Sequence, residues 1–168
     1  MNPRLICFLP VLLLGLSCNR GANGTYFECS GWRLTNLDLS AKTHLTELYC
    51  ERNRLTHLDL SANTNLTELY CDSNSLTNLD LSANAKLKYV YCPDNKLDNL
   101  DLSANTNLTY LDCRINHLTN LDLSANTKLT CVACGGNRIL EIIVANTNKL
   151  PATLLYSGNP VIRQRGSP

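Results

Sequence analysis

The sequence is dominated by a 21-residue segment that occurs five times in succession without an insertion. The copies begin at Leu34, Leu55, Leu76, Leu97 and Leu118. They read LTNLDLSAKTHLTELYCERNR, LTHLDLSANTNLTELYCDSNS, LTNLDLSANAKLKYVYCPDNK, LDNLDLSANTNLTYLDCRINH and LTNLDLSANTKLTCVACGGNR. A repeat of this length is typical of solenoids, in which each copy forms one coil and packs on its neighbours.

Each copy contains two short stretches in which alternate residues are apolar, such as Leu37-Asp38-Leu39 and Leu48-Tyr49-Cys50. This period of two predicts that both stretches are strands. An asparagine follows each stretch, where the chain must turn and buried backbone groups need a side-chain partner. We therefore expect two hydrogen-bonded asparagine ladders inside the coils, at Asn53, Asn74, Asn95, Asn116 and Asn137 and at Asn63, Asn84, Asn105 and Asn126.

The predicted fold is a leucine-rich solenoid of parallel β coils with short capping segments and little or no regular helix in the repeats. One copy alone leaves its apolar faces open, whereas stacked copies cover each other and complete parallel-strand hydrogen bonds. The repeats span residues 34–138. We expect residues 19–33 to be a lead-in with a capping half-repeat, and residues 139–168 to be a degenerate sixth copy with a C-terminal cap or tail.

The segment 1–18 has the layout of a secretory signal peptide. Arg4 provides an early positive charge, an apolar run follows from Leu5 to Leu16, and small or polar residues come next. The run is broken by Pro10 and is shorter than the roughly 20 residues of a membrane-spanning helix. Two alternatives remain: lipid attachment at Cys18, because Leu14-Gly15-Leu16-Ser17-Cys18 resembles the lipobox of bacterial lipoproteins, or plain secretion after ordinary cleavage.

The second half of each copy resembles the leucine-rich repeat. Leu66, Leu69, Cys71, Asn74 and Leu76 fit the pattern L-x-x-L-x-C-x-x-N-x-L, with cysteine in the third apolar position. Residues 24 to about 160 are similar to the 21-residue class found in internalin-like bacterial proteins. The resemblance implies binding to a protein or another surface ligand without naming it. The chain departs from the family in its short lead-in, where Trp32 stands in place of the ladder asparagine.

Six of the nine cysteines recur at the repeat spacing, so stacking places them in one column: Cys29, Cys50, Cys71, Cys92, Cys113 and Cys134. We expect buried free thiols, because side chains on adjacent parallel strands lie about 4.8 Å apart, outside the usual range for a disulfide. Cys131 and Cys134 form a C-x-x-C motif, but Cys131 falls at an outward position and is expected to be an exposed thiol. No metal or redox site is predicted, since further ligands are missing nearby.

Other chemistry has little support. The formal net charge is +1, so no basic field attracts nucleic acid. His44, His57 and His117 have no nucleophile at a matching position, and we expect neither an enzyme nor a cofactor. The aspartates that recur at positions 38, 59, 80, 101 and 122 lie beside serine, threonine and asparagine, and we interpret them as structural hydrogen-bonding groups rather than a calcium array.

The outward positions of the cysteine-bearing half vary from copy to copy, whereas the L-T-N-L-D-L-S-A-N half hardly changes. The varied half is therefore the better candidate for recognition. Tyrosine offers a large contact area and a polar tip. The candidate ligand-binding residues are Tyr49, Tyr70, Tyr89, Tyr91, Tyr110, Glu47 and Glu68, with Glu51, Asp72, Asp112 and Arg114 also expected to point outward.

The predicted function is that of an exported surface or secreted module that binds a protein or a glycan through this tyrosine-bearing face. The alternative is a structural or self-associating surface protein without a specific ligand, in which the aromatic stripe only stabilises the sheet. No nucleic-acid partner is predicted, and contact with a membrane is predicted only through the N-terminal lipid.

Overall fold

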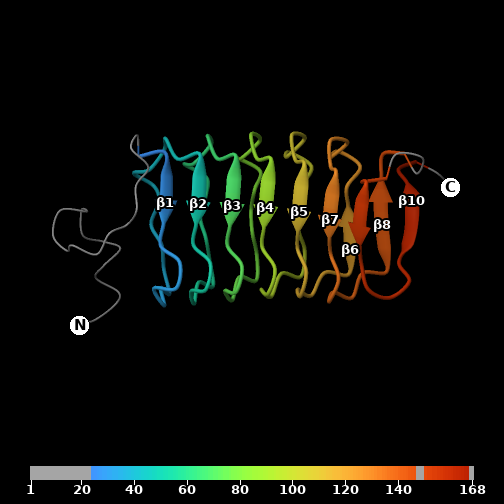
Figure 1. The fold of residues 1–168 in the computed structure, drawn as a ribbon, viewed down its shortest axis with the longest axis horizontal. Coiled ribbons are helices and arrows are strands. Elements are labelled where there is room, and N and C mark those ends of the chain that lie inside the picture. The colour runs from blue at the N-terminus through green and yellow to red at the C-terminus, as the bar shows by residue number, and fades with distance from the viewer. Residues whose placement is uncertain (1–23, 147–149, 167–168) are drawn as a thin grey trace.

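The computed structural model describes residues 24–146 and 150–166. It is a parallel β-solenoid whose coils stack along one long axis, from β1 at one end to β10 at the other (Figure 1). No helix occurs in the described residues, so none there is long and apolar enough to cross a membrane. The predicted fold class is confirmed. Residues 1–23, and with them the predicted signal peptide and Cys18, lie outside the described residues.

The strands are short, and most have three residues. Their bounds are β1 (Tyr26–Glu28), β2 (Glu47–Tyr49), β3 (Glu68–Tyr70), β4 (Tyr89–Tyr91), β5 (Tyr110–Asp112), β6 (Asn120–Asp122), β7 (Cys131–Ala133), β8 (Glu141–Val144), β9 (Thr153–Leu155) and β10 (Val161–Gln164). One parallel sheet has the order β1-β2-β3-β4-β5-β7-β9, and a second has the order β10-β8-β6. The larger sheet forms one long face of the solenoid.

The core follows from the alternation of side chains along each strand. The middle residue of every strand from β2 to β5 points inward, so Leu48 of β2 lies beside Leu69 of β3, and both are fully buried. Leucines from the other sides of each coil, such as Leu55 and Leu60, close the interior. Burying a leucine contributes roughly 1.5–3 kcal/mol, and stacking brings this gain to every inner coil.

The asparagines that follow the strands form the first predicted ladder. In the first copy, Asn53 accepts a hydrogen bond from the backbone N of Leu34 at 2.9 Å. Its amide nitrogen donates to the carbonyl oxygens of Cys29 and Cys50, both at 2.9 Å. Asn74, Asn95, Asn116 and Asn137 repeat this arrangement one coil at a time. Each side chain thus joins two coils and satisfies buried backbone groups, as predicted.

The second ladder corrects one prediction. We expected the first apolar stretch of each copy to be a strand, but within the five copies, residues 34–138, only β6 occurs in this position. In the earlier coils the carbonyl oxygen of Leu60 accepts a hydrogen bond from the side chain of Asn84 at 3.1 Å. Asn105 and Asn126 make the same bond to Leu81 and Leu102. Side chains therefore supply inter-coil bonds that a backbone ladder would otherwise make.

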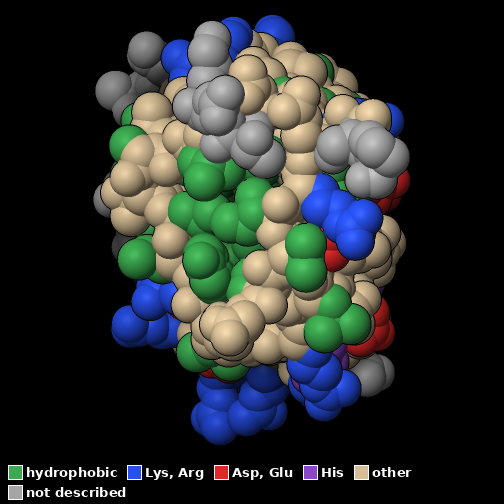
Figure 2. All heavy atoms as spheres, turned by 90° about the vertical axis from the view of Figure 1, so that its right-hand side faces the viewer, with side chains coloured by type: hydrophobic (Ala, Val, Ile, Leu, Met, Phe, Trp, Pro, Cys, Tyr) green, Lys and Arg blue, Asp and Glu red, His purple; other side chains and the backbone are tan. Residues whose placement is uncertain are grey.

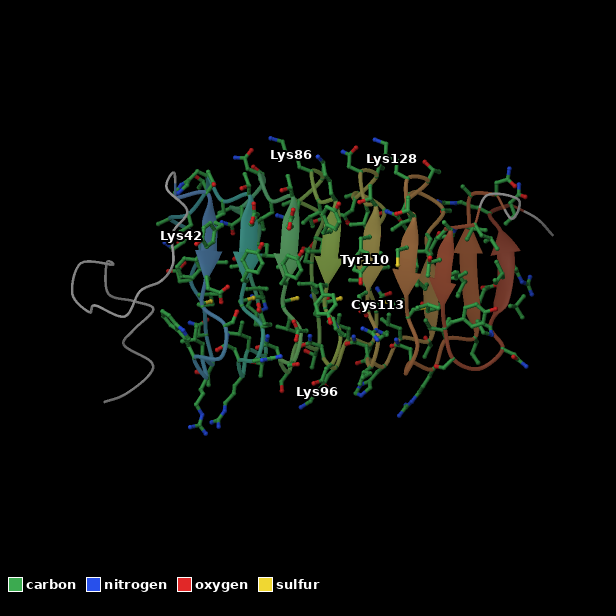
Figure 3. The ribbon with its side chains drawn as sticks, in the orientation of Figure 1. Lys42, Lys86, Lys96, Tyr110, Cys113 and Lys128 are labelled. Carbon is green, nitrogen blue, oxygen red and sulfur yellow. The ribbon has the colours of Figure 1, made fainter. Side chains whose placement is uncertain are left out.

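The column of cysteines lies in the core. All six cysteines of the predicted ladder are buried as thiols, and Figure 3 shows Cys113 with sulfur atoms recurring from coil to coil. Burial raises the pKa of the Cys50, Cys71, Cys92 and Cys113 thiols well above their usual value, since a thiolate would be desolvated there. Cys131 was predicted to be exposed; it lies at an outward position of the sheet, but its side chain is half-buried.

The segment that looks degenerate in the sequence continues both sheets. Thr153 of β9 pairs with Cys131 of β7, one position beyond the repeat spacing. Val161 of β10 pairs with Glu141 of β8, one position short of it. The end of the solenoid beside these strands carries a patch of hydrophobic side chains (Figure 2). Leu155 of β9 and Val161 of β10 are 56% and 52% exposed. Within the described residues, this segment therefore lengthens the solenoid and leaves part of its end exposed.

Candidate recognition face

The outer surface of the larger sheet is built from two side-chain columns, because the first and third residues of each strand point away from the core. We call this surface, from β1 to β7, the recognition face. The first column contains Tyr26, Glu47, Glu68, Tyr89, Tyr110 and Cys131, and the third-position column contains Glu28, Tyr49, Tyr70, Tyr91, Asp112 and Ala133. All seven sequence-predicted ligand-binding residues therefore lie on one face.

Neighbouring tyrosines of the third-position column stack on one another. The rings of Tyr49 and Tyr70 are nearly parallel, with an interplanar angle of 7° and centroids 4.8 Å apart. Tyr91 continues the row at 6.0 Å from Tyr70, with its ring tilted by 40°. The first of these separations equals the ordinary spacing of neighbouring strands, so the sheet itself sets the stack. A half-buried aromatic stripe results, with ring surface left for solvent or a partner.

The stacked tyrosines are fixed by carboxylates on the same strand. The hydroxyl of Tyr49 donates to Glu47 at 3.0 Å, and that of Tyr70 donates to Glu68 at 3.2 Å. Burial, followed by the hydrogen bond and charge of Glu47, raises the pKa of Tyr49 above its usual value of 10. Burial and Glu68 act in the same direction on the pKa of Tyr70. Both phenols therefore stay protonated at neutral pH and keep these donations.

A second group of neighbouring tyrosines lies in the first column, on β4 and β5. Tyr89 and Tyr110 lie in the first column with ring centroids 6.3 Å apart, and Tyr89 is 40% exposed. Figure 3 shows Tyr110 on β5, above Cys113, which comes after the strand. Cys131 is the next residue of this column. The tyrosines thus lie in the third-position column on β2, β3 and β4 and in the first column on β4 and β5.

Asp112 was predicted to point outward, and the structure corrects this prediction. Alternation places it in the column of Tyr91, but its side chain is only 1% exposed. The guanidinium of Arg114 covers it, with Nη2 2.7 Å from Oδ2 and Nε 3.0 Å from Oδ1. A carboxylate that is desolvated in this way needs such a partner, because an isolated buried charge is costly. Alternation predicts the direction of the side chain but not the neighbour that buries it.

Tyr26 is a member of the face that sequence reasoning missed. Its ring meets that of Tyr49 edge-on, with centroids 6.3 Å apart, and its strand begins the sheet. The signal was present, since one repeat length before Glu47 lies Tyr26. The lead-in thus contributes to the recognition face as well as to the end of the core.

The aspartate column on the other side of the coils has a structural role. Asp59 and Asp80 each accept a hydrogen bond from the backbone N of the serine that follows in the turn, at 2.9 Å. Hydrogen bonds from the side chain and backbone of Ser82 lower the pKa of Asp80. No group of three or more potential metal ligands occurs in the described residues. These carboxylates accept hydrogen bonds within their own turns, which agrees with their interpretation as structural hydrogen-bonding groups.

Comparisons with known proteins identify the fold. Neither a scan against protein-family models nor a search of curated proteins found a match. Among solved structures, the chain is similar to the functional domain of InlJ from Listeria monocytogenes, which includes a cysteine ladder. The identity is 38% and the TM-score 0.72, over 84% of this chain and 30% of that chain.

More distant structures share the fold. The leucine-rich-repeat domain of APL1B matches with 20% identity and a TM-score of 0.67, over 83% of this chain and 46% of that one. The internalin InlF from Listeria monocytogenes matches with 14% identity and a TM-score of 0.56, over 84% of this chain and 45% of that one. The chain spans less than half the length of each of these neighbours.

The protein is a leucine-rich-repeat solenoid with a cysteine ladder. Its structural neighbours include internalin-like bacterial proteins, one of which also includes a cysteine ladder. The outward positions that vary from copy to copy lie on the larger sheet of this solenoid.

Proposed function

We propose that the protein is an exported module that binds another protein through the recognition face. The observation that carries this proposal is the row of half-buried tyrosines across β2, β3 and β4, continued by Tyr89 and Tyr110. Tyrosines of this kind supply contact area at low cost in side-chain entropy and are enriched in protein interfaces. The hydroxyls of Tyr49 and Tyr70 are oriented before binding by Glu47 and Glu68, which reduces the ordering cost of association.

The similarity to leucine-rich-repeat proteins supports binding to a protein in preference to a glycan. The variation among copies supports the same surface, because it is concentrated at the outward positions of the strand-bearing half. The opposite side of the coils repeats asparagine, aspartate and serine at equivalent positions and is engaged in its own turns. A surface of that uniformity offers little to distinguish one partner from another.

Self-association is a second candidate function, and one observation favours it. Leu155 of β9 and Val161 of β10 are exposed, and the end of the solenoid carries a hydrophobic patch (Figure 2). Exposed apolar patches and strand edges are common contact points between copies of a protein. Sedimentation velocity over a wide range of protein concentration tests this candidate, which requires oligomers that dissociate on dilution.

The proposal is tested by screening the labelled full-length protein against arrays of extracellular proteins and glycans. We expect saturable binding to a protein that is at least about ten-fold weaker for Tyr49→Ser/Tyr70→Ser. The control is Asn78→Ala, at an exposed position on the other half of the coil. Saturable binding only to glycans, or equal binding by all variants, would contradict the proposal. Thermal unfolding of each variant shows whether it is folded.

Export and anchoring form part of the proposal and have their own test. The signal-like segment 1–18 ends at Cys18, which we propose to be acylated. Metabolic labelling with an alkyne fatty acid is expected to mark the wild type in the membrane fraction. The Cys18→Ala variant is expected to lose the label and leave the membrane. Equal, unlabelled release of both proteins would mean plain secretion.

A further inference from the structure

Negative charge gathers on the recognition face over its first three strands. Glu47 of β2 lies directly beside Glu68 of β3 in the parallel register. Glu51 and Asp72 follow these strands, each just beyond a stacked tyrosine and a buried cysteine, and all four side chains are partly exposed. Like charges on adjacent strands repel each other and destabilise a sheet. The face therefore carries unfavourable electrostatics that a cationic partner would relieve.

The chain does not supply that cation from the part that the structure describes. Its ion pairs there join Arg114 to Asp112, His117 to Asp98 and Arg163 to Glu141. None of them includes Glu47, Glu51, Glu68 or Asp72.

Three lysines lie at the edges of the coils. Figure 3 shows Lys86 and Lys128 at the turns along one edge of the coils and Lys96 at the opposite edge. Lys86 and Lys128 donate to the side-chain oxygens of Asn65 and Asn107, at 2.7 and 2.6 Å. Oε2 of Glu51 is buried and accepts no hydrogen bond, which leaves one carboxylate oxygen unsatisfied.

The fourth copy shows how a cation fits this face. Asp112 occupies the column of Tyr49 and Tyr70, and Arg114 bonds to both of its carboxylate oxygens. There the chain provides its own guanidinium. On β2 and β3 the carboxylates of Glu47 and Glu68 lie in the first column, beside the stacked rings of Tyr49 and Tyr70. Guanidinium groups bind carboxylates through paired hydrogen bonds.

We propose that the partner is a protein that lays an arginine side chain across β2 and β3, between Glu47 and Glu68. This inference rests on the proposed function, since it names the chemistry of the partner for the same face. A lysine would neutralise the charge, but its ammonium is a point charge, whereas the planar guanidinium presents several donors to two carboxylates together.

The test starts with random peptides displayed on phage and selected against the immobilised full-length protein. Peptides that bind the wild type and fail to bind Tyr49→Ser/Tyr70→Ser depend on the recognition face. We expect these peptides to be enriched in arginine relative to the unselected library. Face-dependent peptides without such enrichment would overturn the arginine proposal and leave the proposed function intact. A failure to find any face-dependent peptide would overturn both.

The strongest peptide is then synthesised and its affinity measured by calorimetry at low and high salt. Glu47→Gln/Glu68→Gln is expected to weaken binding by about ten-fold or more at low salt, with a smaller effect at high salt. Replacing the peptide's arginine with citrulline, which has the same shape and no charge, is expected to cause a similar loss. The matched control Asp98→Asn removes an exposed acid elsewhere on the coil and is expected to leave affinity unchanged.

The glutamine variant also has an internal check on folding. Glutamine retains an acceptor for the tyrosine hydroxyl, and the substitution removes the repulsion between the paired glutamates. Its unfolding midpoint at low salt is therefore expected to equal or exceed that of the wild type. Equal peptide affinity for this folded variant and the wild type would overturn the arginine proposal.

Discussion

At the scale of single residues, the stacked coils depend on a few polar side chains with fixed partners. Asn95 accepts a hydrogen bond from the backbone N of Leu76 at 3.0 Å and donates to the carbonyl oxygens of Cys71 and Cys92. These groups are buried, so water cannot replace a lost bond. The repeat asparagine is therefore a structural requirement of each coil, even though it is polar.

Replacing Asn95 with alanine is expected to lower the free energy of unfolding by about 2–4 kcal/mol, because three buried backbone groups lose a partner. Urea denaturation of the full chain measures this change. Asn78→Ala serves as the control, since Asn78 is exposed and its loss is expected to cost less than about 0.5 kcal/mol. Equal effects of the two substitutions would contradict the role of the ladder.

A second residue-scale feature is a left-handed backbone position that recurs in successive coils. Ser73, Asp94 and Ile115 have φ values of 53°, 55° and 54°, and Gly136 has a φ of 71°. Glycine suits this conformation, and a Cβ at Gly136 would lie 3.2 Å from the backbone N of Ile115. A β-branched side chain is poorly suited to it, so Ile115 is strained as well as 59% exposed.

Ile115→Asn is expected to raise the free energy of unfolding by about 1 kcal/mol, because asparagine tolerates the left-handed region better than isoleucine. The reverse change at the equivalent position, Ser73→Ile, is expected to lower it by a similar amount. Chemical denaturation of both variants checks the pair. A loss of stability in Ile115→Asn would show that the contacts of Ile115 outweigh its backbone strain.

At the scale of elements, the larger sheet separates two kinds of cysteine. The ladder cysteines, which follow the strands, are buried, whereas Cys131 at the start of β7 is partly exposed. Cys134 ends the ladder, and burial raises its pKa to about 11. Cys131, at the start of β7, is half-buried on the recognition face. The two cysteines of the C-x-x-C motif therefore differ in access because they belong to different sides of the sheet.

Alkylation of the native protein with iodoacetamide at mildly alkaline pH, followed by peptide mapping, is expected to label Cys131 and to spare the six ladder cysteines. All six are buried, and a raised pKa keeps the thiols of Cys50, Cys71, Cys92, Cys113 and Cys134 protonated at this pH, whereas only a thiolate reacts. Labelling of the ladder should appear when the chain is unfolded in urea. Rapid labelling of Cys71 or Cys92 in the native state would contradict the buried ladder.

The sequence predicted some elements better than others, for physical reasons. The strand at Leu48 was predictable because its alternation is supported by a backbone ladder. The stretch at Leu58 to Leu60 shows the same alternation without forming a strand, since the side-chain amide of Asn84 donates a hydrogen bond to the carbonyl oxygen of Leu60. Alternation reports which side of the chain is buried, and it does not say which hydrogen-bond donor satisfies the backbone.

At the scale of the whole molecule, exact repetition made the fold and the alignment of the recognition face predictable. A step of one repeat length places Tyr49 beside Tyr70 on the sequence alone. The burial of Asp112 was not predictable in this way, because it depends on Arg114, which occurs in one copy only. The path of the last coil was also hidden, since its spacing departs from the repeat by one position in each sheet.

The central claim is that partners bind the recognition face, and tyrosine-resolved NMR tests it most directly. The chain has seven tyrosines, and Tyr156, 43% exposed near the end of the solenoid, is an internal reference. Full-length protein with ¹³C-labelled tyrosine is titrated with the protein identified in the array screen. We predict shifts in the ring signals of Tyr49, Tyr70, Tyr89, Tyr91 and Tyr110 with Tyr156 unchanged. Shifts confined to Tyr156, with the other six tyrosines unmoved at saturation, would contradict the claim.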